Sequence, residues 1–396
     1  MVARAQPAEE PWLNPDVLKW AREWRGRTLE EAAMKVKKQP DDIAAWERGD
    51  KTPTVKQARA LAAFYDRAFL ELLLPEPPPL PEPVSLHDYR MHRQILPPSE
   101  SWEFREIQGW AETQRINALD LYEEIGESPP EFPTSLFARP NDTPSSAAER
   151  IRQVLGFPVE RQAGMTVEQA RKLPDILRGL FESTGILTLK RTDLVKFRVR
   201  GICIAEFPLP VIVITKESPA AQAFTLIHEL GHVVRRASGI SGFIERRKNP
   251  LDIEGWCNKF AGAFLMPESY LRLLVGPVPL RPAASIADNT LKKYARSLSV
   301  SPHAMLVRMV DLGYVQADYY WKVKRPEFDS QEEEYTGGGR AVYYGSRYRA
   351  MQGDLYTGLV LDAWGTDRIT NHNAAEFMGI KNIDHLYAIR DHFGDS

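Results

Sequence analysis

The stretch that decides the fold of this chain is Phe224-Thr225-Leu226-Ile227-His228-Glu229-Leu230-Gly231-His232-Val233-Val234. Its apolar residues recur at helical spacing, and residues four apart share one face of a helix. His228 and His232 can therefore present two imidazoles to a single metal ion, the pattern of an H-E-x-x-H motif. Glu229, beside them, can act as general base on a water molecule at that metal. The spacing favours metal-assisted hydrolysis of a peptide bond.

The residues around the two histidines decide between a metal site and an ordinary core helix. Histidines in apolar helices are often hydrogen-bonded core residues, and the motif also arises by chance. Here Leu226, Leu230 and Val233 belong to a buried helix body, so two imidazoles among them would be costly without a partner. Gly231 is a poor helix former, tolerable if the backbone approaches another group closely. We therefore favour the metal site.

A second predicted helix, from about 252 to 266, supplies candidates for the third ligand. A catalytic zinc takes three protein ligands and keeps one position for water. Glu254 and Asn258 lie four apart on one helix face, so we infer Glu254 as the ligand and Asn258 as the residue that orients a ligating histidine. Asp252 is an alternative ligand. Cys257 is chemically plausible but less well placed, since it falls on the apolar stripe.

These two segments together resemble the ImmA/IrrE family of metallopeptidases. The residues that carry the resemblance are His228-Glu229-Leu230-Gly231-His232, Glu254-x-x-Cys257-Asn258-x-Phe260-Ala261 and Phe264-Leu265-Met266-Pro267. The resemblance implies a zincin-like domain in which His228, His232 and Glu254 bind zinc, with manganese in some members, and Glu229 is catalytic. Cys257 stands where the family usually has alanine. The resemblance also implies proteolysis of a DNA-binding repressor or a related regulator.

The group that stabilises the oxyanion of the reaction is not identified by the sequence. Tyr270 is a candidate only because it is near in sequence, and side-chain packing is the better interpretation of it. His303 follows Pro302, which indicates the start of a helix rather than a metal ligand.

Composition narrows the class of protein. The chain has 396 residues, a formal net charge of −2 and 43% hydrophobic residues, typical of several ordinary globular domains. This charge gives no overall attraction to nucleic acid or to membranes, and no apolar run approaches the ~18 residues of a membrane span. Only Cys203 and Cys257 are cysteines, which indicates a reducing compartment. We expect a cytoplasmic protein without a membrane partner.

The first 74 residues predict a small helical domain with four short helices between turn signals. Asn14-Pro15 begins the first helix, Thr28-x-x-Glu31 and Thr54-x-x-Gln57 are capping boxes, and Gly49 separates the third helix from the fourth. This succession, with Trp46-Glu47-x-Gly49 near its centre, resembles an XRE-type helix-turn-helix domain.

DNA binding by this domain is an open alternative. Residues 1–70 carry 13 Lys and Arg against 11 Asp and Glu, well short of a basic footprint. The expected recognition helix begins Pro40-Asp41-Asp42, and carboxylates repel phosphate. A local phosphate-contacting patch could still form around the turn. Its candidate residues are Lys37, Lys38, Arg48 and Lys51. A solvated surface or a protein-docking module is the competing interpretation.

The rest of the chain predicts three further regions. Residues 75–100 are a proline-rich linker, extended and stiff. Residues 101–334 form the metallopeptidase domain with a preceding helix near 101–125, and 335–396 a small C-terminal domain of two or three short helices. Three β-prone runs, at 185–190, 200–207 and 210–215, predict a small antiparallel sheet. The expected fold class is mostly α with this sheet, α+β and multi-domain.

Two functions are consistent with these features. The first is a zinc-dependent endopeptidase of a regulatory system, whose protein substrate is a partner repressor or antitoxin. The second is a catalytically silent antitoxin or transcription regulator that binds a toxin or DNA through the helix-turn-helix domain. Some members of the long branch that this layout resembles lie beside toxin genes.

Overall fold

A computed structural model describes residues 13–65, 67–77, 87–88, 102–242, 253–333 and 344–394. The chain divides into two compact units, residues 1–83 with 99–105 and residues 84–98 with 106–396. Most of the predicted linker, the alternative ligand Asp252 and the start of the predicted C-terminal domain lie outside the described residues. The domain boundaries at 74, 100 and 334 remain predictions.

The N-terminal unit is a bundle of short helices, as the capping signals predict. Its elements are α1 (Pro15–Trp24), α2 (Leu29–Val36), α3 (Pro40–Glu47), α4 (Val55–Phe64) and a 3-10 helix (Phe69–Leu73). Thr28 with Glu31, and Thr54 with Gln57, form the two expected capping boxes. Val17, Leu18 and Ile43 are completely buried in its core. The amphipathic helices therefore close around one small core.

The second unit contains a five-stranded sheet with the order β1-β5-β3-β4-β2. Its strands are β1 (His87–Asp88), β2 (Leu187–Lys190), β3 (Val199–Ile204), β4 (Val211–Ile214) and β5 (Gly239–Gly242). The sheet is mixed and not purely antiparallel as expected, since β2 pairs with β4 in parallel and β1 with β5 in parallel. A short loop joins β3 to β4, so these two neighbouring strands run antiparallel. Residues 191–198 connect β2 to β3, which are not neighbours in the sheet, because β2 pairs with the other edge of β4.

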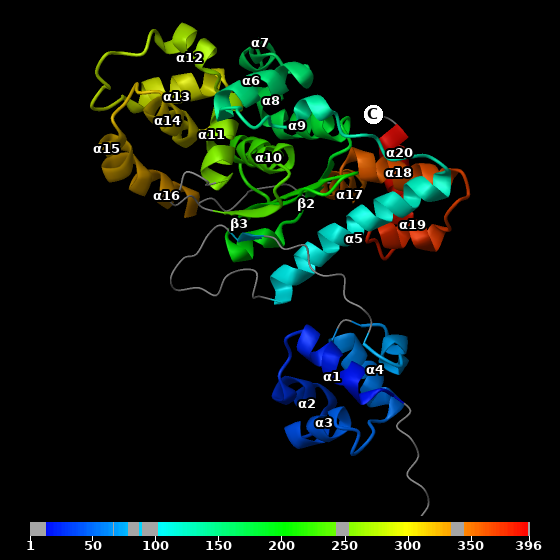
Figure 1. Ribbon diagram of the computed structural model, residues 1–396. Coiled ribbons are helices and arrows are strands. Elements are labelled where there is room, and N and C mark those ends of the chain that lie inside the picture. The colour runs from blue at the N-terminus through cyan, green and yellow to red at the C-terminus, as the bar shows by residue number, and fades with distance from the viewer. Residues whose placement is uncertain are drawn as a thin grey trace, which may run out of the picture. The chain divides into compact units, whose positions relative to one another are not determined.

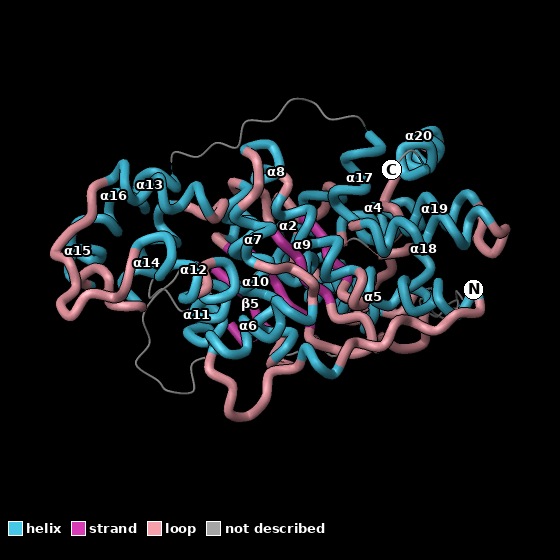
Figure 2. Tube along the Cα trace, turned by 90° about the horizontal axis from the view of Figure 1, so that it is seen from above, coloured by secondary structure: helices cyan, strands magenta, loops and turns pink. Residues whose placement is uncertain are grey.

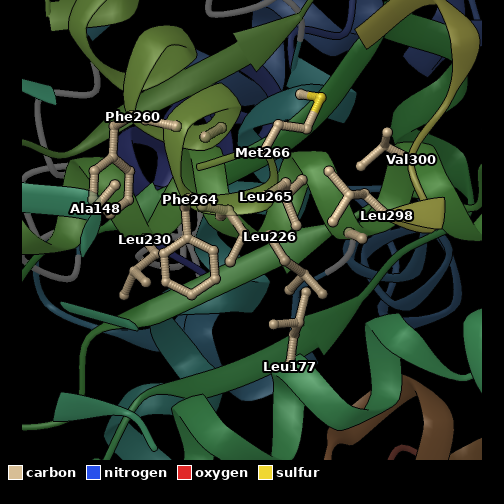
Figure 3. Close-up of a cluster of buried hydrophobic side chains, with 14 of the residues drawn as sticks. Ala148, Leu177, Leu226, Leu230, Phe260, Phe264, Leu265, Met266, Leu298 and Val300 are labelled. Atoms are coloured by element: carbon tan, nitrogen blue, oxygen red, sulfur yellow. The ribbon is translucent and has the colours of Figure 1, made fainter. Parts of the chain in front are cut away.

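Helices cover the sheet in layers (Figure 1). Helix α9 (Leu173–Glu182) packs on β2, and α10 (Pro219–Val234) packs on β3 and β4. Helix α11 (Ile253–Leu265) packs on α10, and α6 (Pro144–Val154) packs on α11. Figure 3 shows Leu177, Leu226 and Phe264, one from each of α9, α10 and α11, in a single apolar cluster. Burial on both sides explains why α10 is apolar almost all round.

Further helices surround this framework (Figure 2). Apart from the C-terminal helices described below, they are α5 (Trp102–Ile125), α7 (Val159–Ala163), α8 (Val167–Arg171), α12 (Glu268–Val275), α13 (Asp288–Ser297), α14 (Pro302–Asp311), α15 (Ala317–Tyr319) and α16 (Arg325–Glu333). Two 3-10 helices (Thr134–Leu136 and Asp193–Phe197) and a π-helix (Tyr320–Lys324) complete them. The mostly helical α+β class is confirmed. Among the described residues, no helix combines the length and the apolar character that a membrane span requires.

Three buried side chains hold the C-terminal end of α11. The hydrogen bonds run from Arg152 Nη1 to Phe264 O (2.6 Å), from Gln162 Nε2 to Leu265 O (3.0 Å) and from Arg308 Nε to Met266 O (3.1 Å). We call Arg152, Gln162 and Arg308 the carbonyl clamp. The last carbonyls of a helix have no partner within the helix, so these side chains supply the missing donors.

The C-terminal residues pack against α9 and β2. They form four helices, α17 (Tyr344–Gln352), α18 (Asp354–Gly365), α19 (Asn371–Phe377) and α20 (Asp384–Gly394), where two or three were expected. Gly353 lies between α17 and α18 with a φ of +80°, a conformation that glycine adopts without strain. A Cβ at this position would also lie 2.7 Å from Thr188 O, so a larger residue would not fit. The buried Glu182 carboxylate accepts hydrogen bonds from the backbone N–H groups of Asp354 (2.9 Å) and Leu355 (3.1 Å).

Candidate metal centre

Helix α10 carries the H-E-x-x-H residues in its second half. Ser218 caps the helix by accepting a hydrogen bond from the N–H of Ala221, and Pro219 occupies the first turn. His228, Glu229 and His232 are buried, as are the apolar residues between them. The sequence therefore places three ionisable groups inside the core, on a helix fixed by packing on both sides.

Glu254, in the first turn of α11, meets the two histidines. Its Oε2 lies 3.2 Å from His228 Nε2, and its Oε1 lies 2.9 Å from His232 Nε2. The two Nε2 atoms are 3.3 Å apart. Among the described residues, these three side chains form the one group with metal-ligand spacing. The structure thus brings together the two histidines and the more distant carboxylate that the sequence singles out.

The distances between these atoms fit a small divalent cation. Ligands at the usual zinc bond lengths of about 2.0–2.1 Å, in tetrahedral arrangement, lie about 3.3 Å from one another. The three observed separations are 2.9, 3.2 and 3.3 Å. Two imidazole nitrogens and one carboxylate are also the donor set of many catalytic zinc sites. His228, His232 and Glu254 therefore fit a divalent metal ion.

Asn258 contacts one of the two imidazoles. Its Oδ1 lies 3.0 Å from His228 Nδ1, so the ring can donate at Nδ1 while Nε2 faces His232 and Glu254. An amide oxygen at Nδ1 favours the tautomer that leaves the lone pair on Nε2, as outer partners of metal-binding histidines commonly do. Asn258 is one helical turn beyond Glu254, so α11 supplies both the carboxylate and the orienting amide.

Gly201, on β3, makes room for the Glu229 side chain. A Cβ at this position would lie 2.8 Å from Glu229 Cδ and 2.9 Å from its Cγ, closer than real contacts allow. Any larger residue would therefore displace the carboxylate. Glu229 is completely buried. Helix α10 and strand β3 together fix the carboxylate beside the two histidines.

Gly231 serves the approach of α11 to α10. A Cβ on Gly231 would lie 3.0 Å from Cys257 Sγ and 3.3 Å from its Cα, so the glycine lets the helices come together at this point. The Cys257 thiol is buried where α11 meets α10. Burial raises the pKa of this thiol, and His232 offsets that effect only in part. The thiol is therefore protonated at neutral pH.

The electrostatics of the centre favour positive charge. Burial would raise the pKa of Glu254, but the imidazoles of His228 and His232 lower it well below its ordinary value. Burial would lower the pKa of His232, but Cys257, Glu254 and Glu229 raise it well above its ordinary value. The two shifts share a cause, since a carboxylate and imidazoles lie against one another in a region from which water is excluded. Such a region stabilises a bound cation.

The other residues considered from the sequence lie outside this group. Tyr270 is half-buried and packs against the apolar core. His303 is the second residue of α14, where its Nε2 lies 2.9 Å from Tyr320 Oη and its ring stacks on Phe328. Cys257 is buried but is not part of the metal-ligating group among the described residues.

The four cations considered for DNA binding lie around α2 and α3. Lys37 ends α2 in the left-handed conformation, and Lys38 follows it, both exposed. Arg48 Nε forms an ion pair with Asp50 (2.8 Å), and Lys51 Nζ lies 3.8 Å from Asp42. Two of the four charges are therefore paired with carboxylates of the same unit.

Sequence reasoning missed two contributors to this region. Gly201 lies in a β-prone run, and a glycine inside a strand indicates a close approach, so this signal was present. The carbonyl clamp contacts carbonyls that lie 42 to 112 residues away in the chain. Its side chains carry no local signal, because polar residues in α6 and α14 resemble ordinary surface positions.

Two family models match the chain. Residues 182–308 match the IrrE N-terminal-like domain, which belongs to the metallopeptidases, and residues 18–72 match a helix-turn-helix model. The first match includes α10 and α11 and therefore every residue of the candidate centre. Comparison with curated proteins finds no match. The chain thus carries an IrrE N-terminal-like peptidase domain that follows an XRE-type helix-turn-helix domain.

Proposed function

We propose that this protein is a zinc-dependent endopeptidase of a regulatory system, which cuts a partner repressor or antitoxin. The observation that carries the proposal is the convergence of His228, His232 and Glu254 at 2.9–3.3 Å, with the buried Glu229 on the same helix. The matched peptidase domain supports a protein substrate, and the helix-turn-helix domain on the same chain supports a regulatory role.

The residues divide the chemistry among them. His228, His232 and Glu254 would hold the metal, and Asn258 keeps the His228 ring oriented. A divalent metal in such a site polarises a peptide carbonyl and acidifies water. The Glu229 carboxylate takes the proton of the attacking water and passes it to the amine that leaves. Gly201 keeps that carboxylate in place by leaving room for it.

The test compares the full chain with two variants. Candidate substrates are the regulators encoded next to this protein, incubated with purified chain and zinc or manganese. Glu229→Gln should still bind metal but lose about 10²–10⁴-fold in cleavage, because proton transfer is the role removed. His228→Ala should lose both. Intact candidates with either metal, together with identical results for wild type and Glu229→Gln, would count against the proposal.

A catalytically silent regulator is the second candidate, favoured by the helix-turn-helix match at 18–72. In this account the domain binds a toxin or DNA, with Lys37 and Lys38 as exposed phosphate contacts. It predicts that Glu229→Gln and His228→Ala keep full biological activity in cells. For DNA, it predicts binding that weakens steeply with salt, measured by fluorescence anisotropy on promoter DNA. Flat anisotropy at low salt would exclude the DNA form.

A further inference from the structure

The reactive groups of the candidate centre are closed off from solvent. The exposed fractions are 3% for His228, 0% for Glu229, 0% for His232 and 7% for Glu254. In the proposed function, the Glu229 carboxylate takes a proton from water that attacks a peptide bond, so the peptide must come next to it. A substrate chain can therefore reach the centre only after part of the structure has moved.

Strand β3 adjoins the Glu229 carboxylate at Gly201. One neighbour of β3 in the sheet is β4, and the other is β5, which pairs with β3 antiparallel. In the register of this second pair, Ser241 lies directly opposite Gly201. Opposed residues of antiparallel strands have Cα atoms about 4.5–5.5 Å apart. Strand β5 therefore lies one strand spacing from the glycine that makes room for Glu229.

The position of β5 is the one that an extended substrate would need. A peptide in extended conformation binds to a sheet by adding a strand and exchanging backbone hydrogen bonds with it. Beside β3, next to the candidate centre, that place is taken by β5 of the same chain. An extended segment of a protein substrate can pair with β3 there only after β5 has left it.

The sequence and the pairing of β5 indicate a weakly held strand. Its four residues read Gly-Ile-Ser-Gly, and glycine weakens a strand because it loses the most conformational freedom on ordering. By contrast, β4 on the other side of β3 reads Val-Ile-Val-Ile, which is typical of a stable strand. The ladder between β3 and β5 is also irregular, since its register shifts between Val199 and Gly201. Beyond β5, the sheet ends with the two residues of β1.

We propose that β5 is an internal occupant of the substrate-binding edge of β3, and that this structure is the closed state of the peptidase. An extended segment of the protein substrate replaces β5 and pairs with β3 beside Gly201, which opens the centre to the peptide bond that is cut. The chain thus keeps its own centre closed until β5 leaves β3. This inference rests on the proposed function and adds how access to the centre is controlled.

Cys203 offers a reversible test, because it lies on β3 directly opposite Gly239 of β5. Gly239→Cys places a second thiol opposite Cys203, at a Cα separation that a disulfide spans. Oxidation then locks β5 to β3, and reduction releases it. Gly239→Cys combined with Cys203→Ala is the matched control, since no bridge can form between these two positions.

The probe is a fluorescently labelled peptide hydroxamate, whose hydroxamate binds zinc, added to the zinc-loaded full chain. Oxidised Gly239→Cys should bind the probe at least about 10-fold more weakly than the reduced form at equal zinc content, because only open molecules can bind. The control should bind equally under both conditions. Equal affinities of oxidised and reduced Gly239→Cys, with the bridge confirmed by mass spectrometry, would overturn the inference and leave the proposed function standing.

Backbone hydrogen exchange of the full chain is a second measurement that needs neither metal nor bridge. Residues 239–242 should exchange well before residues 211–214 of β4, through a local opening that leaves the rest of the fold intact. Ser241→Pro, which removes a backbone N–H from β5, should speed exchange in β3 as well. Exchange of 239–242 only through global unfolding would overturn the inference. A wild-type chain that binds no zinc would instead overturn the proposed function.

Discussion

Helix α11 has polar groups buried at both ends, and the two ends differ in what their partners are. At the C-terminal end, each carbonyl receives an N–H donor from the carbonyl clamp at 2.6–3.1 Å. At the N-terminal end, Glu254 and two imidazole Nε2 atoms face one another at 2.9–3.3 Å. Donors and acceptors that match stabilise the fold. Several acceptors that point toward one position form a cation-binding site.

The largest expected effect follows from removing one imidazole. For wild type, zinc at a thousand times its dissociation constant should raise the free energy of unfolding by about 4 kcal/mol. His228→Ala should gain almost nothing, because the site loses a ligand. Calorimetric melting with and without zinc measures the difference. His372→Ala, an exposed histidine on α19, is the control and should respond like wild type. An equal zinc response in His228→Ala would contradict the site.

Gly201→Ala tests the position of the Glu229 carboxylate separately from metal binding at the candidate centre. The new Cβ would lie 2.8 Å from Glu229 Cδ, so the carboxylate must move. Cleavage should fall about 100-fold, since a displacement near 1 Å has that order of effect, while zinc affinity stays close to wild type. Gly179→Ala is the control, because nothing lies within 4 Å of its Cβ. Unchanged cleavage in Gly201→Ala would show that Glu229 is not held in this way.

The local part of this centre was predictable from the sequence. The spacing of His228, Glu229 and His232 follows from the helical repeat alone, and the apolar pattern of residues 253–265 places Glu254 and Asn258 on one face. The helix ends were also predictable, because capping residues act within one turn. The capping box of Thr28 and Glu31 is an example.

What the sequence could not predict depends on contacts between distant segments. The parallel pairing of β2 with β4 depends on where residues 191–198 cross, and strand propensity does not encode direction. Arg152, Gln162 and Arg308 have no local pattern that distinguishes them from surface residues. Their role depends on where the end of α11 lies in the folded core.

Gln162→Leu tests the other end of α11. It removes the donor to Leu265 O and to Leu298 O, and two buried carbonyls without donors should cost about 2–4 kcal/mol. Urea unfolding measures the loss, and the folded variant should keep its zinc affinity. Gln153→Leu, on the exposed side of α6, is the control. A variant that keeps its stability but loses its zinc affinity would contradict the assignment of fold stability to this end of α11 and of metal binding to the other.

The smallest expected effect concerns the buried Glu182 at the C-terminal helices. Burial raises its pKa above the ordinary value, although Arg178 and the hydrogen bonds from Thr188 and Leu355 oppose the shift. The folded state therefore favours the protonated form, and this contribution to stability is lost as the pH rises through the raised pKa. Glu182→Gln should remove this contribution to the pH dependence of the free energy of unfolding. Identical profiles for wild type, Glu182→Gln and the exposed Glu168→Gln would contradict this.

Anomalous X-ray diffraction at the zinc absorption edge, on crystals of the full chain grown with zinc, tests the central claim most directly. The account predicts one strong peak within bonding distance of His228 Nε2, His232 Nε2 and a Glu254 carboxylate oxygen. Crystals with no peak there, and with the three side chains turned away from one another, would contradict it.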